Sequence, residues 1–264
     1  MSKKLNFGYI IPIHVKSKDI GRALKSIDGL KSTTVVVCCS NSIKEWIESN
    51  SGELVPKRLK GNKFNYCTSE DTSYQNLVNI GIEELKDKVE YISILEFDDK
   101  VNPNAHTEIL PYFNNTPDAE LYLPLACLVV DNDKKENDSS LQMIAMLNEA
   151  PLATGMFEDY GIVDMDTMLK ANFVFVNGGY FRTSAFEKYG MFKKNMEILY
   201  DYELILRFLN SGCKVVSVPK IARFHFYRPD SEFERQKSML GEYRDKWLKL
   251  AKQEYFFDED RVIA

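Results

Sequence analysis

Residues 1–115 alternate short apolar runs with amphipathic segments. The β-branched and aromatic residues of the apolar runs predict strands, which are Phe7–Ile13, Thr33–Cys39, Lys63–Cys67 and Tyr91–Leu95. Apolar positions at helical spacing predict the helices between them, which are Asp19–Leu30, a short helix behind Ser40–Ser42, one that ends near Leu85 and one that starts near Pro103. This uninterrupted alternation is typical of a right-handed parallel sheet in an α/β protein.

The second half of the chain has a less regular pattern. A strand-like run at Leu121–Val130 contains Pro124, a polar loop follows at Asp131–Ser140, and the Met- and Leu-rich segment Leu141–Asn172 predicts one or two helices. The remaining predicted elements are a strand at Phe173–Val176, a tight turn at Asn177–Gly179, helices at Ser184–Tyr189 and Asp201–Ser211, strands at Lys214–Val218 and Ile221–Phe226, and a charged amphipathic helix at Glu232–Lys252. We therefore expect two halves of one domain, residues 1–115 and 116–230, followed by a C-terminal helix and tail at 231–264.

The composition fits a large globular domain. The 264 residues are 44% hydrophobic and carry a net charge of −5 without a dense basic block, which argues against bulk attraction to nucleic acid or to an anionic membrane. The N-terminal segment indicates a first strand and not a signal peptide. No apolar run approaches the ~20 residues of a membrane span. The 5 cysteines are scattered, so we expect a cytoplasmic protein with reduced thiols and no zinc site.

The acids Glu96, Asp98 and Asp99 follow directly on the predicted strand Tyr91–Leu95. Ligands of open α/β sheets bind beyond the carboxyl ends of the strands. Acids this close repel one another, and a hard divalent cation such as Mg²⁺ or Mn²⁺ relieves the repulsion through oxygen ligands. The cluster therefore predicts a metal site. A solvated turn is the alternative, because Asp and Asn favour turns.

Separated segments of the chain, taken in order, resemble family 2 glycosyltransferases of the GT-A fold, which use nucleotide sugars. They are the opening strand FGYIIPIH, the helix SYQNLVNIGIE, the acidic strand end YISILEFDD, and the acceptor-side pieces NGGYFRTSAFEKYGMF and LYDYELILRFLNSGCKVVSVP. Residues 121–172 lie outside the resemblance. It implies an α/β GT-A fold with a mostly parallel central sheet flanked by helices and an acceptor-side subdomain.

The resemblance also implies roles for individual residues. Glu96, Asp98 and Asp99 would hold Mn²⁺ or Mg²⁺, and His225 would complete the metal shell unless it is a structural histidine. Asp201 would be the carboxylate base that takes the acceptor proton, with a helix N-cap as its alternative. The residues implied in binding the donor are Pro12, His14, Ser40, Asn41, Asn79, Glu96, Asp98, Arg182 and Arg228, with surface ion pairs as the alternative for both arginines.

These roles predict a metal-dependent, inverting, non-processive glycosyltransferase. It would move a sugar from a UDP- or GDP-sugar to a hydroxyl acceptor such as a glycan, a lipid-linked sugar or a glycoprotein. The Gln-x-x-Arg-Trp motif of processive synthases is absent. The chain departs from the family at Glu96, which replaces the usual first Asp, at Tyr200, where many relatives have Glu, and at Ser40 and Asn41, where an acid commonly reads the nucleobase.

Two other functions stay open at this point. The departures at Tyr200 and at Ser40 and Asn41 are compatible with a catalytically degenerate GT-A-like domain that binds carbohydrate or protein without turnover. A nucleotidyltransferase uses a similar sheet and acidic metal site, but it needs a basic loop for triphosphate. The segment after Ile13 offers Lys16, Lys18 and Arg22 without a Gly-rich cradle.

Overall fold

The alternating first half of the chain folds into four parallel strands, in the spatial order β3-β2-β1-β4. Their bounds are Phe7–Pro12 for β1, Thr33–Cys39 for β2, Phe64–Thr68 for β3 and Tyr91–Ile94 for β4. Every residue of β1 and β4 is buried, as expected for continuous apolar strands in a sheet covered on both faces. The computed structural model describes residues 5–59, 64–130, 142–147, 156–157, 160–170, 176–196, 198–226, 245–246 and 249.

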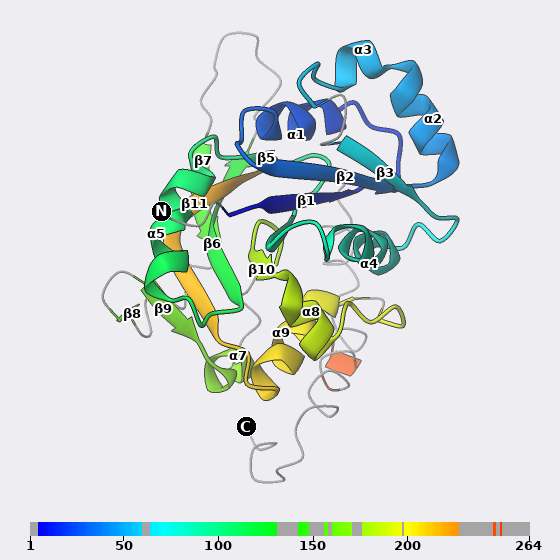
Figure 1. Ribbon diagram of the computed structural model, residues 1–264. Coiled ribbons are helices and arrows are strands. Elements are labelled where there is room, and N and C mark those ends of the chain that lie inside the picture. The colour runs from blue at the N-terminus through cyan, green and yellow to red at the C-terminus, as the bar shows by residue number, and fades with distance from the viewer. Residues whose placement is uncertain are drawn as a thin grey trace.

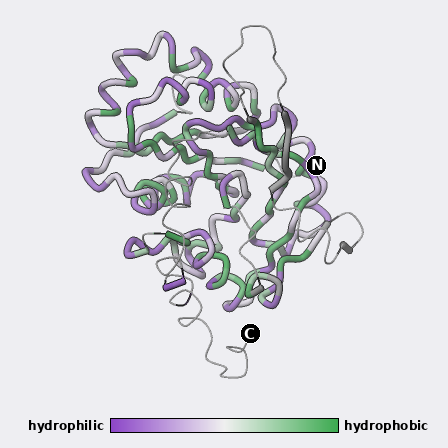
Figure 2. The backbone as a smooth tube through the Cα atoms, turned by 180° about the vertical axis from the view of Figure 1, so that it is seen from behind, coloured by the Kyte–Doolittle hydropathy of each residue, from purple (hydrophilic) through white to green (hydrophobic). Residues whose placement is uncertain are grey.

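Helices cover both faces of these strands (Figure 1). Their bounds are Ile20–Ile27 for α1, Asn41–Ser49 for α2, Ser51–Leu54 for α3, Tyr74–Leu85 for α4 and Ala105–Asn115 for α5. Successive residues of β2 face opposite ways, so Val35 and Val37 pack in the core shared with α1, α2 and α5, whereas Val36 and Cys38 pack with α4. Figure 2 shows the hydrophobic residues concentrated along the central strands.

The second half extends the same sheet. β10 runs antiparallel between β4 and β6, and β11 lies parallel to β6. The remaining bounds are Lys100–Val101 for β5, Leu121–Val130 for β6, Gln142–Leu147 for β7, Met156–Phe157 for β8, Tyr160–Val163 for β9, Tyr180–Arg182 for β10, Val215–Phe226 for β11, Met165–Lys170 for α7, Thr183–Tyr189 for α8 and Tyr200–Asn210 for α9. Residues of α8 and α9 share the core on the α4 face of the sheet. Among the described residues, every helix is too short or too polar to cross a bilayer.

The structure corrects the prediction for Leu141–Asn172. Its described residues form β7, β8 and β9, and the only helix among them is the short α7. β9 pairs antiparallel with β11 and β7 pairs with β6. Pairing with existing strands therefore decides the conformation, and it overrides the helical preference of Met and Leu.

Prolines interrupt the strands less than predicted. Pro124 lies inside β6, between two pairing regions. The pairing of β6 with β10 reaches only as far as Tyr122 of β6, and the pairing of β6 with β7 starts at Ala126 of β6. The missing N–H of Pro124 therefore removes no ladder bond on that side. β11 continues through Pro219 as one strand, with the register shifting between Val218 and Ile221. Such a bulge leaves the proline unpaired.

Other predictions are shifted or lie outside the described residues. α5 begins at Ala105, so Pro103 precedes the helix instead of lying in its first turn. The loop Asp131–Ser140, the strand Phe173–Val176 apart from its last residue, and Arg228 lie outside the described residues, as does the helix Glu232–Lys252 apart from 245–246 and 249.

Candidate metal and catalytic site

The loop after β4 brings two of the predicted acids together. The backbone N–H of Asp99 donates to the carbonyl of Glu96 at 3.0 Å, which closes a turn. The next residues form β5, which pairs antiparallel with β11 so that Lys100 lies opposite Phe224. Continuing this register by one residue sets Asp99 beside His225. The short pairing of β5 with β11 therefore brings together Asp99 and His225, which are 126 positions apart in the sequence.

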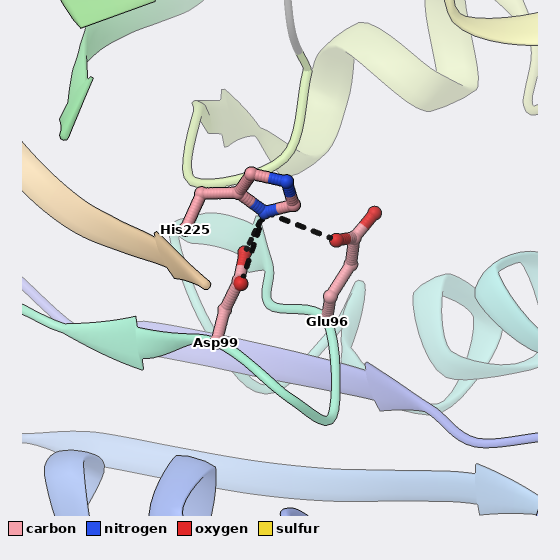
Figure 3. Close-up of side chains that lie close together, drawn as sticks. All are labelled: Glu96, Asp99 and His225. Atoms are coloured by element: carbon pink, nitrogen blue, oxygen red, sulfur yellow. Dashed lines mark hydrogen bonds and ion pairs between the residues drawn. The ribbon is translucent and has the colours of Figure 1, made fainter. Parts of the chain in front are cut away.

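Glu96, Asp99 and His225 face one another at this point (Figure 3). One ligand atom from each lies within 4.8 Å of the others. His225 Nδ1 lies 3.1 Å from Asp99 Oδ1 and 3.7 Å from Glu96 Oε2. Carboxylate oxygens and an imidazole nitrogen suit Mn²⁺, and the carboxylates alone suit Mg²⁺. The residues present therefore fit the predicted cation.

Asp99 is fully buried and held by several donors. Arg223 Nη1 donates to its Oδ2 at 2.6 Å, and the backbone N–H of Phe226 donates to its Oδ1 at 3.2 Å. Burial acts to raise the pKa of Asp99, but Arg223 and His225 outweigh it and hold the pKa below its ordinary value. For His225, burial acts to lower the pKa, and the bond to Asp99 together with the charges of Asp99 and Glu96 raises it above normal. Because its pKa is held below the ordinary value, Asp99 is ionised at neutral pH.

Glu96 has a different environment. Its Oε1 accepts a hydrogen bond from Asn177 Nδ2 at 2.6 Å. Burial first, and the charge of Asp99 second, raise the pKa of Glu96 to about 7. Ionising both acids together is unfavourable because like charges repel at this distance, and a bound cation reverses that penalty.

Asp98, also predicted as a metal ligand, is not part of this cluster. The residue is buried, at 7% exposed, but its carboxylate is not among the ligand atoms that lie within 4.8 Å of one another. Its backbone carbonyl accepts a hydrogen bond from Arg22 Nη2 at 2.6 Å. The guanidinium of Arg22 also lies 3.9 Å from the ring centre of Phe226, next to His225. The loop is thereby fixed to α1 and to the end of β11.

Asp201 lies in the first turn of α9 and is not its N-cap, which corrects the alternative drawn from the sequence. Leu199 occupies the N-cap position with φ of 59° and makes no side-chain cap bond. Asp201 Oδ1 accepts the backbone N–H of Tyr202 at 2.8 Å. Burial raises the pKa of Asp201 to about 6. At neutral pH the carboxylate is mostly ionised and able to accept a proton.

A chain of contacts links Asp201 to the metal cluster. Tyr200, its neighbour in α9, stacks on Tyr74 with ring centres 5.0 Å apart. The Tyr74 hydroxyl donates to Asn177 Oδ1 at 2.5 Å, and Asn177 donates to Glu96. The structure therefore brings the predicted base close to three of the four predicted metal ligands, Glu96, Asp99 and His225.

Four donor-side candidates lie at the carboxyl ends of the adjacent strands β1 and β2. Pro12 ends β1, and exposed His14 follows with its ring edge-on to Phe97 at 5.8 Å. Ser40 caps α2 by accepting the backbone N–H of Ile43, and Asn41 Nδ2 donates to Glu70 at 3.4 Å. These residues share the sheet edge with the acid loop, because β1 pairs in parallel with both β2 and β4.

Asn79 and Arg182 are also predicted to bind the donor, and in the structure both make contacts within the protein. Asn79 uses its Nδ2 and Oδ1 to bond the backbone of Phe192, at 2.8 and 3.0 Å. Arg182 lies opposite Tyr91 in the register, at the start of β4, because β10 runs antiparallel to it. Its guanidinium donates to the Tyr91 hydroxyl and to the Pro117 carbonyl. Arg182 therefore stabilises the opposite edge of the sheet.

Sequence reasoning missed Arg223 and Asn177. Arg223 precedes His225 by two residues in the strand segment IARFHF, and side chains two apart on a strand share a face. A charged residue on the same face as a candidate ligand was the available signal. Asn177 was recognised only as part of a turn, because its bond to Glu96 joins residues 81 positions apart.

Solved structures of TarS and GalNAc-T7 share the fold of this chain, and they confirm the predicted GT-A fold. S. aureus TarS 1-349 in complex with UDP is 12% identical over 97% of this chain and 68% of that chain, with a TM-score of 0.60. The same protein in complex with UDP-GlcNAc is 13% identical over 87% of this chain and 61% of that chain, with a TM-score of 0.59. GalNAc-T7 with UDP, GalNAc and Mn²⁺ is 12% identical over 86% of this chain and 45% of that chain, with a TM-score of 0.55.

The likeness is one of fold and covers part of the neighbours. The chain spans 61% of TarS 1-349 in the UDP-GlcNAc complex and 45% of the longer TarS structure. No family model and no curated protein sequence matches the chain.

Proposed function

We propose that the chain is a metal-dependent, inverting glycosyltransferase that transfers one sugar per encounter from a nucleoside-diphosphate sugar to a hydroxyl acceptor. The observation that supports it best is the meeting of Glu96, Asp99 and His225 beyond β4, with Asp201 linked to them through Tyr74. The fold shared with TarS and GalNAc-T7 adds to this support.

The metal cluster would serve the donor. A divalent cation bound there would stabilise the negative charge that develops on a departing diphosphate. Asp99 supplies an ionised carboxylate, kept in that state by Arg223. Glu96 supplies a second carboxylate whose proton leaves readily near neutral pH. Neighbours bind UDP or UDP-GlcNAc, so UDP-sugars are the first donors to test.

Asp201 would serve the acceptor. An inverting transfer needs a base that takes the proton of the attacking hydroxyl. The pKa of about 6 leaves Asp201 ionised at pH 7 while making it a stronger base than an ordinary aspartate. The transfer rate should therefore fall as the pH drops through about 6.

The test begins with binding. UDP and Mn²⁺ added together should raise the midpoint of thermal unfolding, because a ligand that binds only the folded state stabilises it, by about 2.7 kcal/mol at about 100 times its Kd. Incubation with a panel of nucleotide sugars and Mn²⁺ should then show slow hydrolysis, or transfer to a hydroxyl acceptor.

Asp201→Asn should reduce transfer or hydrolysis by about 10²–10⁴-fold, because it removes the base. Binding of UDP with Mn²⁺ should be unchanged in this variant. Asp118→Asn is the matched control, since Asp118 is 66% exposed in an ion pair with Lys214 and lies away from the site. Full activity in Asp201→Asn would remove the base assignment.

The competing function is a domain that binds carbohydrate without turnover. Tyr200 favours it, because its ring is stacked on Tyr74 and supplies no acid beside Asp201. Binding of UDP with Mn²⁺ but no turnover of any nucleotide sugar, with a range of hydroxyl acceptors present, would favour this function.

A further inference from the structure

The two oxygens of Glu96 have different surroundings. Oε2 faces the cluster, 3.7 Å from His225 Nδ1, whereas Oε1 accepts a hydrogen bond from Asn177 Nδ2 at 2.6 Å. The last torsion of a glutamate side chain is otherwise broad and roughly two-fold. Holding Oε1 gives the carboxylate one orientation. The bond from Asn177 thus decides which oxygen of Glu96 faces His225 and Asp99.

Tyr74 fixes the orientation of the Asn177 amide. An amide nitrogen donates and an amide oxygen accepts, and in the structure the nitrogen of Asn177 faces Glu96 and the oxygen faces Tyr74. The Tyr74 hydroxyl donates to that oxygen at 2.5 Å. Burial, with Tyr200, Glu96 and Asp201 nearby, raises the pKa of Tyr74 well above its usual value, so the hydroxyl keeps its proton. The bonds run in one direction, from Tyr74 to Asn177 to Glu96.

The turn that carries Asn177 is held from two sides. The backbone N–H of Gly178 donates to the carbonyl of Ile94, the last residue of β4, at 2.7 Å. Gly178 has φ of +79°, and a Cβ there would lie 3.1 Å from Arg223 Cδ. Both the positive φ and the close approach favour glycine. Asn177 is thereby tied to the strand that leads to Glu96 and to the arginine that pairs with Asp99.

We propose that Asn177 and Tyr74 are positioning residues of the metal site, which hold Glu96 so that its Oε2 is presented to the cation. The inference rests on the proposed metal-dependent function. The Tyr74 ring also stacks on Tyr200, the residue before Asp201. One side chain therefore sets the metal ligand and the start of the base helix relative to each other.

Mn²⁺ binding to the full chain tests this proposal without turnover. The free Mn²⁺ is followed by electron paramagnetic resonance during titration, with and without saturating UDP. Asn177→Ala should weaken Mn²⁺ binding by about 10–100-fold, the usual effect of losing a group that orients a metal ligand. Tyr74→Phe keeps the stacked ring and removes the hydroxyl, and it should weaken binding by about tenfold. The double variant should bind no more weakly than Asn177→Ala, because Tyr74 acts through Asn177.

Tyr122→Phe is the matched control. Tyr122 is fully buried, and its hydroxyl donates to a carbonyl oxygen, that of the Thr116 backbone, at 2.5 Å. Its variant loses the same kind of bond away from the site and should bind Mn²⁺ like the wild type. Thermal unfolding without metal shows that each variant is folded.

The outcomes separate the inference from the function on which it rests. If the wild type binds Mn²⁺ and both site variants bind it equally well, the positioning role is wrong and the metal site stands. Additive losses in the double variant would contradict the action of Tyr74 through Asn177. If the wild type binds no Mn²⁺ with or without UDP, the metal site and the positioning role both fall.

Discussion

Two carboxylates are fully buried beside an arginine, and they have opposite surroundings. Asp99 pairs with Arg223 at 2.6 Å in the candidate site, and Glu203 pairs with Arg207 at 3.0 Å in α9. Both acids are 0% exposed. Burial and pairing with arginine therefore do not tell a functional acid from a structural one.

The balance of charge around each acid does distinguish them. Glu203 has two cations, because Lys193 lies 3.3 Å from it in addition to Arg207. Arg207 also donates to the carbonyls of Tyr189 and Met191, so it fastens the segment before α9 to the helix. Asp99 has a second acid, Glu96, as its neighbour in the cluster. Glu203 therefore has two cations for one acid, whereas Asp99 shares Arg223 with a second acid, and of the two only Asp99 belongs to a group of described side chains that could hold a cation.

Removing Glu203 is expected to have the largest effect on stability. Glu203→Ala leaves Arg207 and Lys193 without their buried partner, which should lower the free energy of unfolding by about 3–5 kcal/mol. Thermal or urea unfolding measures the loss. The folded fraction should bind Mn²⁺ as the wild type does. A loss of Mn²⁺ affinity as large as that expected for Glu96→Gln, without a loss of stability, would contradict the structural role of Glu203.

Glu53→Gln is the control for this variant. Glu53 pairs with Lys18 at 3.2 Å, but its side chain is 57% exposed. Exposed pairs contribute about 0–1 kcal/mol because water and salt screen them. A loss of stability as large as that of Glu203→Ala would show that burial is not the cause.

Removing the charge of Glu96 should weaken Mn²⁺ binding without lowering the stability of the metal-free protein. Glu96→Gln relieves the repulsion with Asp99, so the metal-free protein should be as stable as the wild type or more stable. Mn²⁺ affinity should fall by more than about tenfold, equivalent to about 1.4 kcal/mol. Unfolding with and without Mn²⁺ measures both quantities. Loss of stability without metal would mean that Glu96 is structural like Glu203.

The parallel half of the fold was predictable because its signals are local. β2 has the predicted bounds, since Val35–Cys39 face the two apolar cores and the ends of the strand are marked by polar turns. Glu96 and Asp99 follow closely on a buried strand, so the direction of β4 was enough to predict that both acids lie at the carboxyl end of the sheet. β7 and β9 could not be predicted in this way, because they depend on pairing with β6 and β11.

The assembly of the site was predictable only in part. His225 and Asp99 are 126 positions apart, and β5, which brings them together, has 2 residues. So short a strand has no periodicity to recognise. The resemblance supplied His225 and Asp201. The spacing of Arg223 to His225 was a local signal for Arg223, whereas the role of Asn177 depends on its contact with Glu96, which no local pattern contains. Arg182 was misplaced because its position depends on β10 running antiparallel to β4.

The smallest predicted effect extends the comparison to Asp201. Burial raises the pKa of Asp201 to about 6 in the folded chain, from 3.8. Between these values the folded state binds more protons than the unfolded state, so the contribution of Asp201 to stability falls as pH rises and is unfavourable above about 6. Asp201→Asn should therefore stabilise the protein by about 1–2 kcal/mol at pH 7 and by much less at pH 4. Urea unfolding at both pH values measures the difference, and equal effects would show that ionised Asp201 is as well accommodated as Glu203.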